Sequence, residues 1–166
     1  QAARGLGLYF WRGDTIPRHN LPGRPVFDPL MAVFFLLGLL WLLRHWRKPA
    51  AALTLLWTLG MLAPTILAED APHFLRAVGV LPLAMLPPAL GLERFWRWLS
   101  ARRGLRRIAP AVIVLLLACS LGLTVRDYFV RYARDPRTGC AFQAAAVELA
   151  GRIEQAQGAV YASRRF

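Results

Sequence analysis

Four apolar blocks, each about as long as a lipid bilayer is thick, constrain this chain more than any other feature of its sequence. They cover residues 29–46, 49–68, 74–92 and 108–125, and charged residues cluster between them. The second block has 20 residues, and as an α-helix it would extend over ~30 Å, about one hydrocarbon thickness. Structures that cross a bilayer must satisfy their own backbone hydrogen bonds. The sequence therefore predicts an all-α membrane protein with about four transmembrane helices.

Local signals mark the start of the first helix and an irregularity in the third. Pro29 is a good first helical residue after Asp28, whose carboxylate can cap the helix. The third block contains Pro82, Pro87 and Pro88, and a proline inside a helix removes a backbone donor and clashes with the preceding turn. We expect a kinked span here, packed in a bundle where neighbouring groups satisfy the freed carbonyls.

The two terminal segments differ from the apolar region. Residues 1–28 are polar and rich in turn residues, which predicts an outer loop with a short helix at its start. Residues 126–166 have the composition of a soluble segment, with an apolar stripe at helical spacing formed by Phe142, Ala146, Leu149 and Ile153. Residues 159–162 are predicted to begin a strand. The tail is therefore expected to be the start of a small α/β outer domain that continues beyond this sequence.

Basic residues predict the orientation in the membrane. The segments 44–48 and 93–107 together hold nine Lys or Arg in 20 residues, whereas the segment 69–73 holds none. Cytoplasmic loops carry the excess of Lys and Arg, so the first two segments are expected on the cytoplasmic side and the third outside. An even number of spans then leaves both ends of the chain outside the cell (inner) membrane.

The net charge of +12 would suit a nucleic-acid-binding protein if the basic residues formed one patch. They instead follow the ends of the apolar blocks, as membrane topology requires. We therefore expect the lipid bilayer as a partner and no nucleic acid.

One pair of basic residues lies at the outer start of the third block. His73 and Arg76 are three residues apart and share a helix face. Their position beside a helix N-terminus at the membrane boundary suits an anion such as a lipid phosphate. In the alternative interpretation, Arg76 extends to the lipid head groups and His73 is solvated.

Other polar residues are candidates for substrate or acceptor contacts. Glu69 and Asp70 could hold a divalent cation or orient an acceptor hydroxyl, or they could be a plain polar helix end. The outer loop before the first span supplies four more candidates, which are Asp14, Arg18, His19 and Asn20. For Asp14, a role as a base competes with a salt bridge inside the loop. The histidines fall in separate segments, so the sequence indicates no metal site formed by them, and no cofactor is expected beyond that cation.

Three elements carry a resemblance to a known family: GD…RHNLPGRPVFDP before the first span, APHFLRAVGVLP at the third and ALGLERF after it. The chain resembles the C-terminal part of bacterial polytopic membrane glycosyltransferases of the dolichyl-phosphate-mannose protein mannosyltransferase type, which have the C-type (GT-C) fold. In that family a membrane helix begins at the outer face with a basic residue and continues with prolines. Arg76, Pro82, Pro87 and Pro88 are similar, whereas Ala77 stands where an aromatic residue is usual.

The resemblance implies a glycosyltransferase that moves a sugar from a polyprenyl-phosphate donor to an acceptor on the outer face of the membrane. It assigns the catalytic base to an early outer loop, which would lie upstream of Gln1, so the catalytic residue is unknown here and the fragment is expected to be inactive alone. Arg76 and His73 would bind the donor phosphate. Two alternatives are a non-catalytic membrane scaffold or accessory subunit, and a transporter or lipid flippase segment. No charged residue lies at the middle of a predicted span, which disfavours the transporter.

Overall fold

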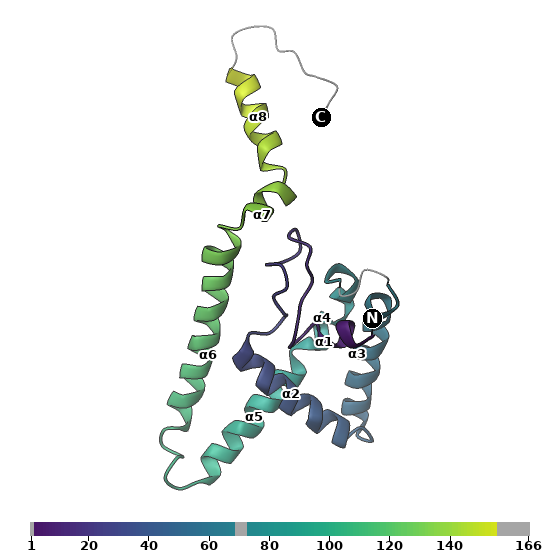
Figure 1. The fold of residues 1–166 in the computed structure, drawn as a ribbon. Coiled ribbons are helices and arrows are strands. Elements are labelled where there is room, and N and C mark those ends of the chain that lie inside the picture. Colours follow the sequence, from purple (N-terminus) through teal and green to yellow (C-terminus); the bar gives the residue numbers. More distant parts are fainter. Residues whose placement is uncertain (1, 69–72, 156–166) are drawn as a thin grey trace.

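A computed structural model describes residues 2–68 and 73–155, and within them every regular element is a helix (Figure 1). Two of these elements are not α-helices: η1 (Leu75–Val80) is a 3₁₀-helix and η2 (Asp127–Tyr132) is a π-helix. The elements are α1 (Ala2–Gly7), α2 (Pro29–Arg44), α3 (Pro49–Leu67), η1 (Leu75–Val80), α4 (Leu81–Ala84), α5 (Leu86–Ala101), α6 (Ala109–Arg126), η2 (Asp127–Tyr132), α7 (Pro136–Ala141) and α8 (Ala144–Gln155).

Among the described residues, three helical stretches are long and apolar enough to cross a membrane, namely Pro49–Leu67, Leu75–Ala101 and Ala109–Tyr132. The chain is therefore an all-helical membrane protein by length and composition. The first predicted span is shorter than expected, because α2 ends at Arg44 and has 16 residues. At ~1.5 Å per residue that is about 24 Å, less than the ~30 Å of a hydrocarbon core.

The third predicted span differs most from the expectation of one kinked helix over 74–92. It consists of η1, then α4, then a break at Met85, after which α5 begins at Leu86. Pro82, Pro87 and Pro88 lie in the first residues of α4 and α5, where the missing N–H removes no helical hydrogen bond. The predicted basic loop from residue 93 is also shorter than expected, because α5 continues to Ala101.

The central helix pair is α2 and α5, which cross and contact each other more than any other two helices do (Figure 1). Gly38 lies against the carbonyl oxygen of Pro87, and Gly91 lies against the carbonyl oxygen of Phe34. A Cβ atom at either glycine would come within 2.0 Å of that oxygen. Small residues that let two backbones approach are typical of helix pairs in membranes.

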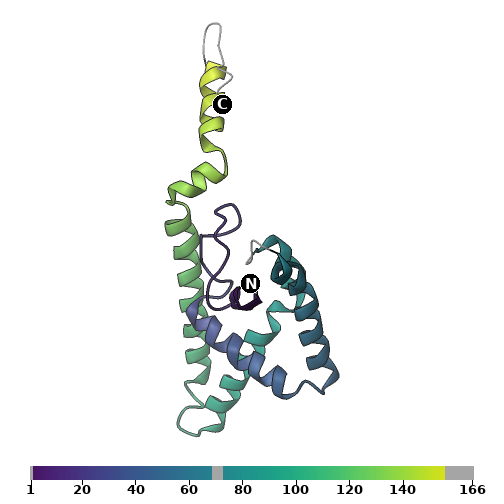
Figure 2. The ribbon, with the colours of Figure 1, turned by 45° about the vertical axis from the view of Figure 1, so that its right-hand side comes forward.

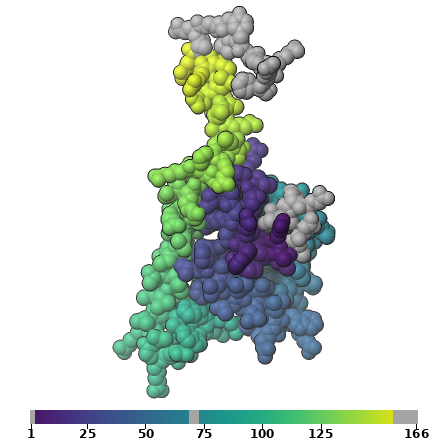
Figure 3. All heavy atoms as spheres, viewed as in Figure 1, coloured from purple at the N-terminus to yellow at the C-terminus, as the bar shows by residue number. Residues whose placement is uncertain are grey.

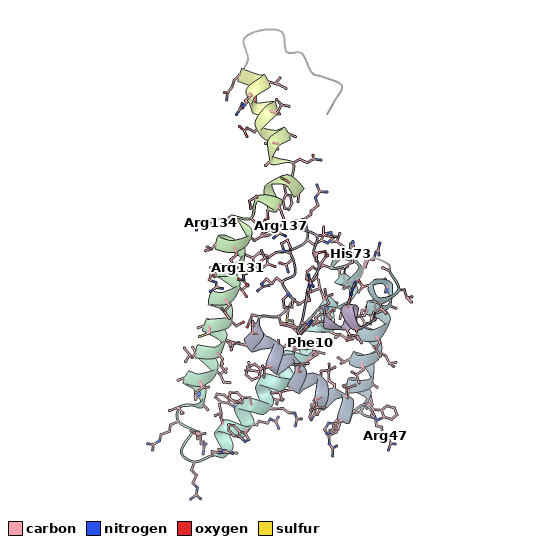
Figure 4. The ribbon with its side chains drawn as sticks, in the orientation of Figure 1. Phe10, Arg47, His73, Arg131, Arg134 and Arg137 are labelled. Carbon is pink, nitrogen blue, oxygen red and sulfur yellow. The ribbon has the colours of Figure 1, made fainter. Side chains whose placement is uncertain are left out.

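The helices have two chemically different ends. The turns at 45–48 and 102–108, which carry the basic clusters, lie together at one end, here called the turn end (Figure 1). Residues 8–28 and His73 lie at the other, here called the loop end. Figure 4 shows Arg47 at the turn end, with His73, Arg131 and Arg137 at the loop end. This common end for the two basic clusters is what the predicted topology requires.

The C-terminal part of the described chain extends away from the helices. α7 and α8 project beyond the loop end (Figures 1, 2 and 3), and no residue of either is buried. The predicted helical stripe is confirmed for Ala146, Leu149 and Ile153, which lie in α8. The predicted strand at 159–162 falls outside the described residues, so no α/β domain is shown.

Candidate functional site

The site is built on the loop between α1 and α2, which folds back on itself. The Val26 and Phe27 N–H groups donate to the carbonyls of Leu8 and Tyr9, at 3.1 and 3.0 Å. Further along, the Gly23 N–H donates to the carbonyl oxygen of Asp14 at 2.7 Å. A side chain at Gly13 would overlap the carbonyl oxygen of Arg24, so glycine is required where the two arms of the loop meet.

Asp14 is the organising residue of this loop, and only 1% of it is exposed. One carboxylate oxygen accepts from the Ile16 N–H at 2.7 Å, and the other accepts from His19 Nδ1 at 2.7 Å and from the Phe74 N–H at 3.1 Å. Burial alone would raise the pKa of the Asp14 carboxyl, but the hydrogen bonds from His19, Ile16 and Phe74 outweigh burial. The pKa of Asp14 is therefore lowered and the carboxylate is held ionised.

The third span brings His73 to the same place. The His73 ring lies 4.8 Å from the His19 ring, centroid to centroid. The Thr65 hydroxyl of α3 donates to the carbonyl oxygen of His73 at 2.7 Å, and the next residue, Phe74, bonds Asp14. The structure thus joins two stretches that the sequence singled out separately, the loop with Asp14 and His19 and the start of the third span with His73.

A second set of contacts fastens α6 and η2 to the loop. The Arg24 guanidinium bonds the Asp127 carboxylate at 2.9 Å and the Thr124 hydroxyl at 3.3 Å. The Tyr132 hydroxyl donates to the carbonyl oxygen of Pro17 at 2.6 Å. At the base of the loop, the Ser120 hydroxyl donates to Asp28. Apart from Asp28, which the sequence predicts as a helix cap, these residues did not stand out in the sequence, because their partners lie about a hundred positions away and no local pattern marks them.

A cavity of about 490 Å³ opens beside the Asp14 cluster, and we name it the Arg18 cavity. One part of its wall is polar and basic, formed by Arg18, His19, Asn20 and Arg24. The rest is apolar and comes from the loop, the third span and η2, with Leu8, Tyr9, Val26, Phe74, Leu75, Ala77, Val78, Leu81 and Tyr128. The cavity therefore has the arginines Arg18 and Arg24 at one side and an apolar surface at the other.

The 3₁₀ geometry of η1 explains the apolar part of this wall. A 3₁₀-helix has three residues per turn, so residues three apart lie one above another. Ala77 and Val80 form a buried row, whereas Leu75, Val78 and Leu81 form an exposed row that lines the cavity. The exposed row runs from the polar loop toward the middle of the span, and we name it the η1 stripe.

The remaining predicted residues have different positions. Asn20 is buried, and its side-chain oxygen accepts from the Leu21 N–H at 2.8 Å, so it shapes the loop as well as lining the cavity. Arg76 is exposed and lies between Leu75 and Ala77, both of which line the cavity, but it is not itself part of the wall. Glu69 and Asp70 fall outside the described residues.

A larger cavity of about 930 Å³ lies between Trp11, Asp28 and the segment that joins η2 to α7. Arg131 and Arg137 line it, and Figure 4 shows both at the loop end. Asp127 and Asp135 line it too and bond those arginines at 3.1 and 3.0 Å. Because each basic group here has an acidic partner in the wall, this cavity favours an anion less than the Arg18 cavity does.

Comparisons of the chain with protein-family models, with curated proteins and with solved structures found no match. The function is therefore argued from the sequence and from the geometry of the loop end.

Proposed function

We propose that this chain is part of an integral membrane glycosyltransferase that takes a sugar from a polyprenyl-phosphate donor. The observation that carries the proposal is the Arg18 cavity, which has basic groups at one side and an apolar stripe at the other. A polyprenyl-phosphate sugar has the same two parts, an anionic head and a long apolar chain.

The charges of the cavity suit the phosphate. Arg18 and Arg24 line it beside His19, and the Arg24 guanidinium is already bonded to Asp127. Arg18 is thus the arginine of the wall best suited to a ligand. A guanidinium can bond a phosphate through two parallel N–H groups. Arg76, at the neighbouring start of η1, would add positive charge at the same end, and His73 would contact the phosphate beside it.

The apolar part suits the lipid chain. Leu75, Val78 and Leu81 are each more than half exposed although they lie in a span. In a bilayer, exposed apolar side chains contact lipid tails at no cost. The η1 stripe would therefore direct a polyprenyl chain from the basic wall of the cavity toward the bilayer interior.

Transfer of the sugar rests on the resemblance described above. It requires a base for the acceptor hydroxyl and cations for the phosphate that leaves. The resemblance assigns the base to a loop upstream of Gln1, and the residues of this chain supply the donor side of the site. Asp14, Arg18, His19, Asn20, Glu69 and Asp70 are the candidates for contacts with the donor or the acceptor. Of these six, Arg18, His19 and Asn20 line the cavity.

The topology that goes with this function has four spans, with α2 as a short first span that is accommodated by local thinning of the bilayer. The loop end faces outside the cell membrane and the turn end faces the cytoplasm. In a cysteine-free background of the full-length protein, which includes replacement of Cys119 and Cys140, we expect Gln143→Cys to react with a membrane-impermeant thiol reagent on intact cells. Arg103→Cys should react only after permeabilisation. The opposite pattern would reverse the orientation.

A photocrosslinking experiment tests the binding site. A polyprenyl phosphate with a diazirine on its first isoprene units is reconstituted with the full-length protein in liposomes. We expect crosslinks to peptides that contain the η1 stripe, suppressed by excess unmodified polyprenyl phosphate. Val78→Trp, which fills the stripe, should remove most of this labelling.

The matched control is Leu121→Trp, because Leu121 is an equally exposed apolar residue of α6 outside the cavity. It should leave the labelling unchanged. Crosslinks spread evenly over α3 and α6, with no effect of competitor, would rule out a specific lipid-phosphate site at η1.

A further inference from the structure

Three side chains with metal-binding atoms converge at the loop end. The ligand atoms of Asp14, His19 and His73 all lie within 4.8 Å of one another. Within the described ranges 2–68 and 73–155, no other group of three such residues comes together in this way. The first two side chains come from the loop before α2 and the third from the segment before η1, so the group exists only in the folded protein.

The cluster is held by hydrogen bonds to the backbone of the segment before η1 and to the Asp14 carboxylate. Thr65 fixes the His73 carbonyl, and the Phe74 N–H fixes Asp14 to the start of η1. The Ile16 N–H holds the other Asp14 oxygen. Such supporting hydrogen bonds orient the ligands of metal sites in proteins. The side chains of Asp14 and His19 are 1% and 9% exposed, so water competes poorly for these positions.

The ligand types define the class of ion. Two imidazoles and one carboxylate suit zinc and other first-row transition metals, whereas calcium and magnesium prefer oxygen ligands. Zinc sites with three such protein ligands keep a fourth position open. Zinc binds imidazole nitrogen at ~2.0–2.1 Å, which places tetrahedral ligand atoms about 3.3 Å apart. The ligand atoms would therefore have to move about 1–1.5 Å closer to one another, by side-chain rotation, to surround the ion.

We propose that Asp14, His19 and His73 form a zinc-binding site at the mouth of the Arg18 cavity. Zinc would take the place of the proton between His19 Nδ1 and the Asp14 carboxylate, so that all three side chains bind the ion. Because His19 lines the Arg18 cavity, the open position faces the cavity and accepts water or a phosphate oxygen. This site does not depend on the glycosyltransferase proposal, since zinc binding can be measured without any donor.

The experiment measures zinc bound by the purified full-length protein after removal of metal and titration with Zn²⁺. Cys119 and Cys140 are replaced by serine, because both are exposed thiols that could bind zinc on their own. His19→Gln and His73→Gln should each lower zinc affinity at least ~10-fold, since loss even of an outer partner of a ligand costs 10–100-fold. Co²⁺ in place of zinc should give the intense visible absorption of a tetrahedral site in the parent protein and not in either variant.

His45→Gln is the matched control, because His45 lies at the turn end and bonds the Trp41 carbonyl oxygen. It should keep both the zinc affinity and the cobalt spectrum. Circular dichroism of the metal-free variants separates loss of binding from loss of folding. Equal zinc binding by the parent, His19→Gln and His73→Gln proteins, all with the parent's helix content, would overturn the proposal.

Discussion

Replacing Gly38 or Gly91 by leucine should prevent the membrane region from folding. A Cβ atom at Gly38 would lie 1.8 Å from the Pro87 oxygen, and one at Gly91 would lie 2.0 Å from the Phe34 oxygen. The atoms in conflict belong to rigid helix backbones, so rotation of a side chain cannot relieve the overlap. Overpacking a well-packed core already costs about 1–3 kcal/mol, and here α2 and α5 must separate along their whole contact. Most of a total stability of roughly 5–15 kcal/mol would be lost.

The measurement is the yield and thermal melting of the full-length protein in detergent, followed by fluorescence-detected gel filtration. Alanine at either position should be intermediate, because it adds the clashing atom without the rest of the side chain. Gly60→Leu and Gly122→Leu are the controls, since a Cβ at these positions of α3 and α6 meets nothing within 4 Å. Equal yields and melting temperatures for all four leucine variants would contradict the α2–α5 packing.

The sequence correctly predicted helix starts and ends that depend on neighbouring residues. Asp28 does cap α2, with its carboxylate 2.9 Å from the Leu30 N–H, and Pro29 is the first helical residue as expected. The second span ends within one residue of its prediction, at Leu67. Because these features depend only on residues that are close in the chain, a single sequence is enough to predict them.

The third span was predicted as one kinked helix, whereas the structure divides it into η1, α4 and α5, because a proline has two opposite effects on a helix. It can kink a helix from inside or begin a new one, and residue spacing does not separate these. Only packing against α2 and α3 decides that the chain breaks at Met85. A period of three in Leu75, Val78 and Leu81 was present in the sequence and is the one signal that could have revealed the exposed stripe.

The candidate site was predicted in parts. Asp14, His19 and His73 were each singled out, yet the sequence indicated no metal site, because the two histidines are far apart along the chain. Their convergence depends on how the loop packs against the third span. Arg24 and Asp127 are still farther apart along the chain. No sequence pattern shows that Arg18 lines the cavity whereas Arg76 does not, because this depends on how the loop folds.

The measurement that tests the central claim most directly is sugar transfer from a polyprenyl-phosphate donor by the full-length protein, normalised to correctly inserted protein. Charge-assisted hydrogen bonds contribute roughly 1.5–3 kcal/mol, and ~1.4 kcal/mol is tenfold in rate. Arg18→Ala and Arg76→Ala should therefore each lower transfer at least ~10-fold. Lysine at either position should recover only part, because an ammonium lacks the planar fork of the guanidinium.

Arg47→Ala is the control in the same assay, because Arg47 lies at the turn end, stacked on Trp46 (Figure 4). It should transfer sugar at the parent rate. We expect transfer by the parent protein, losses of at least ~10-fold for Arg18→Ala and Arg76→Ala, and no loss for Arg47→Ala. Near-normal transfer by Arg18→Ala and Arg76→Ala, or no transfer by the parent from any polyprenyl-phosphate sugar, would contradict the proposed function.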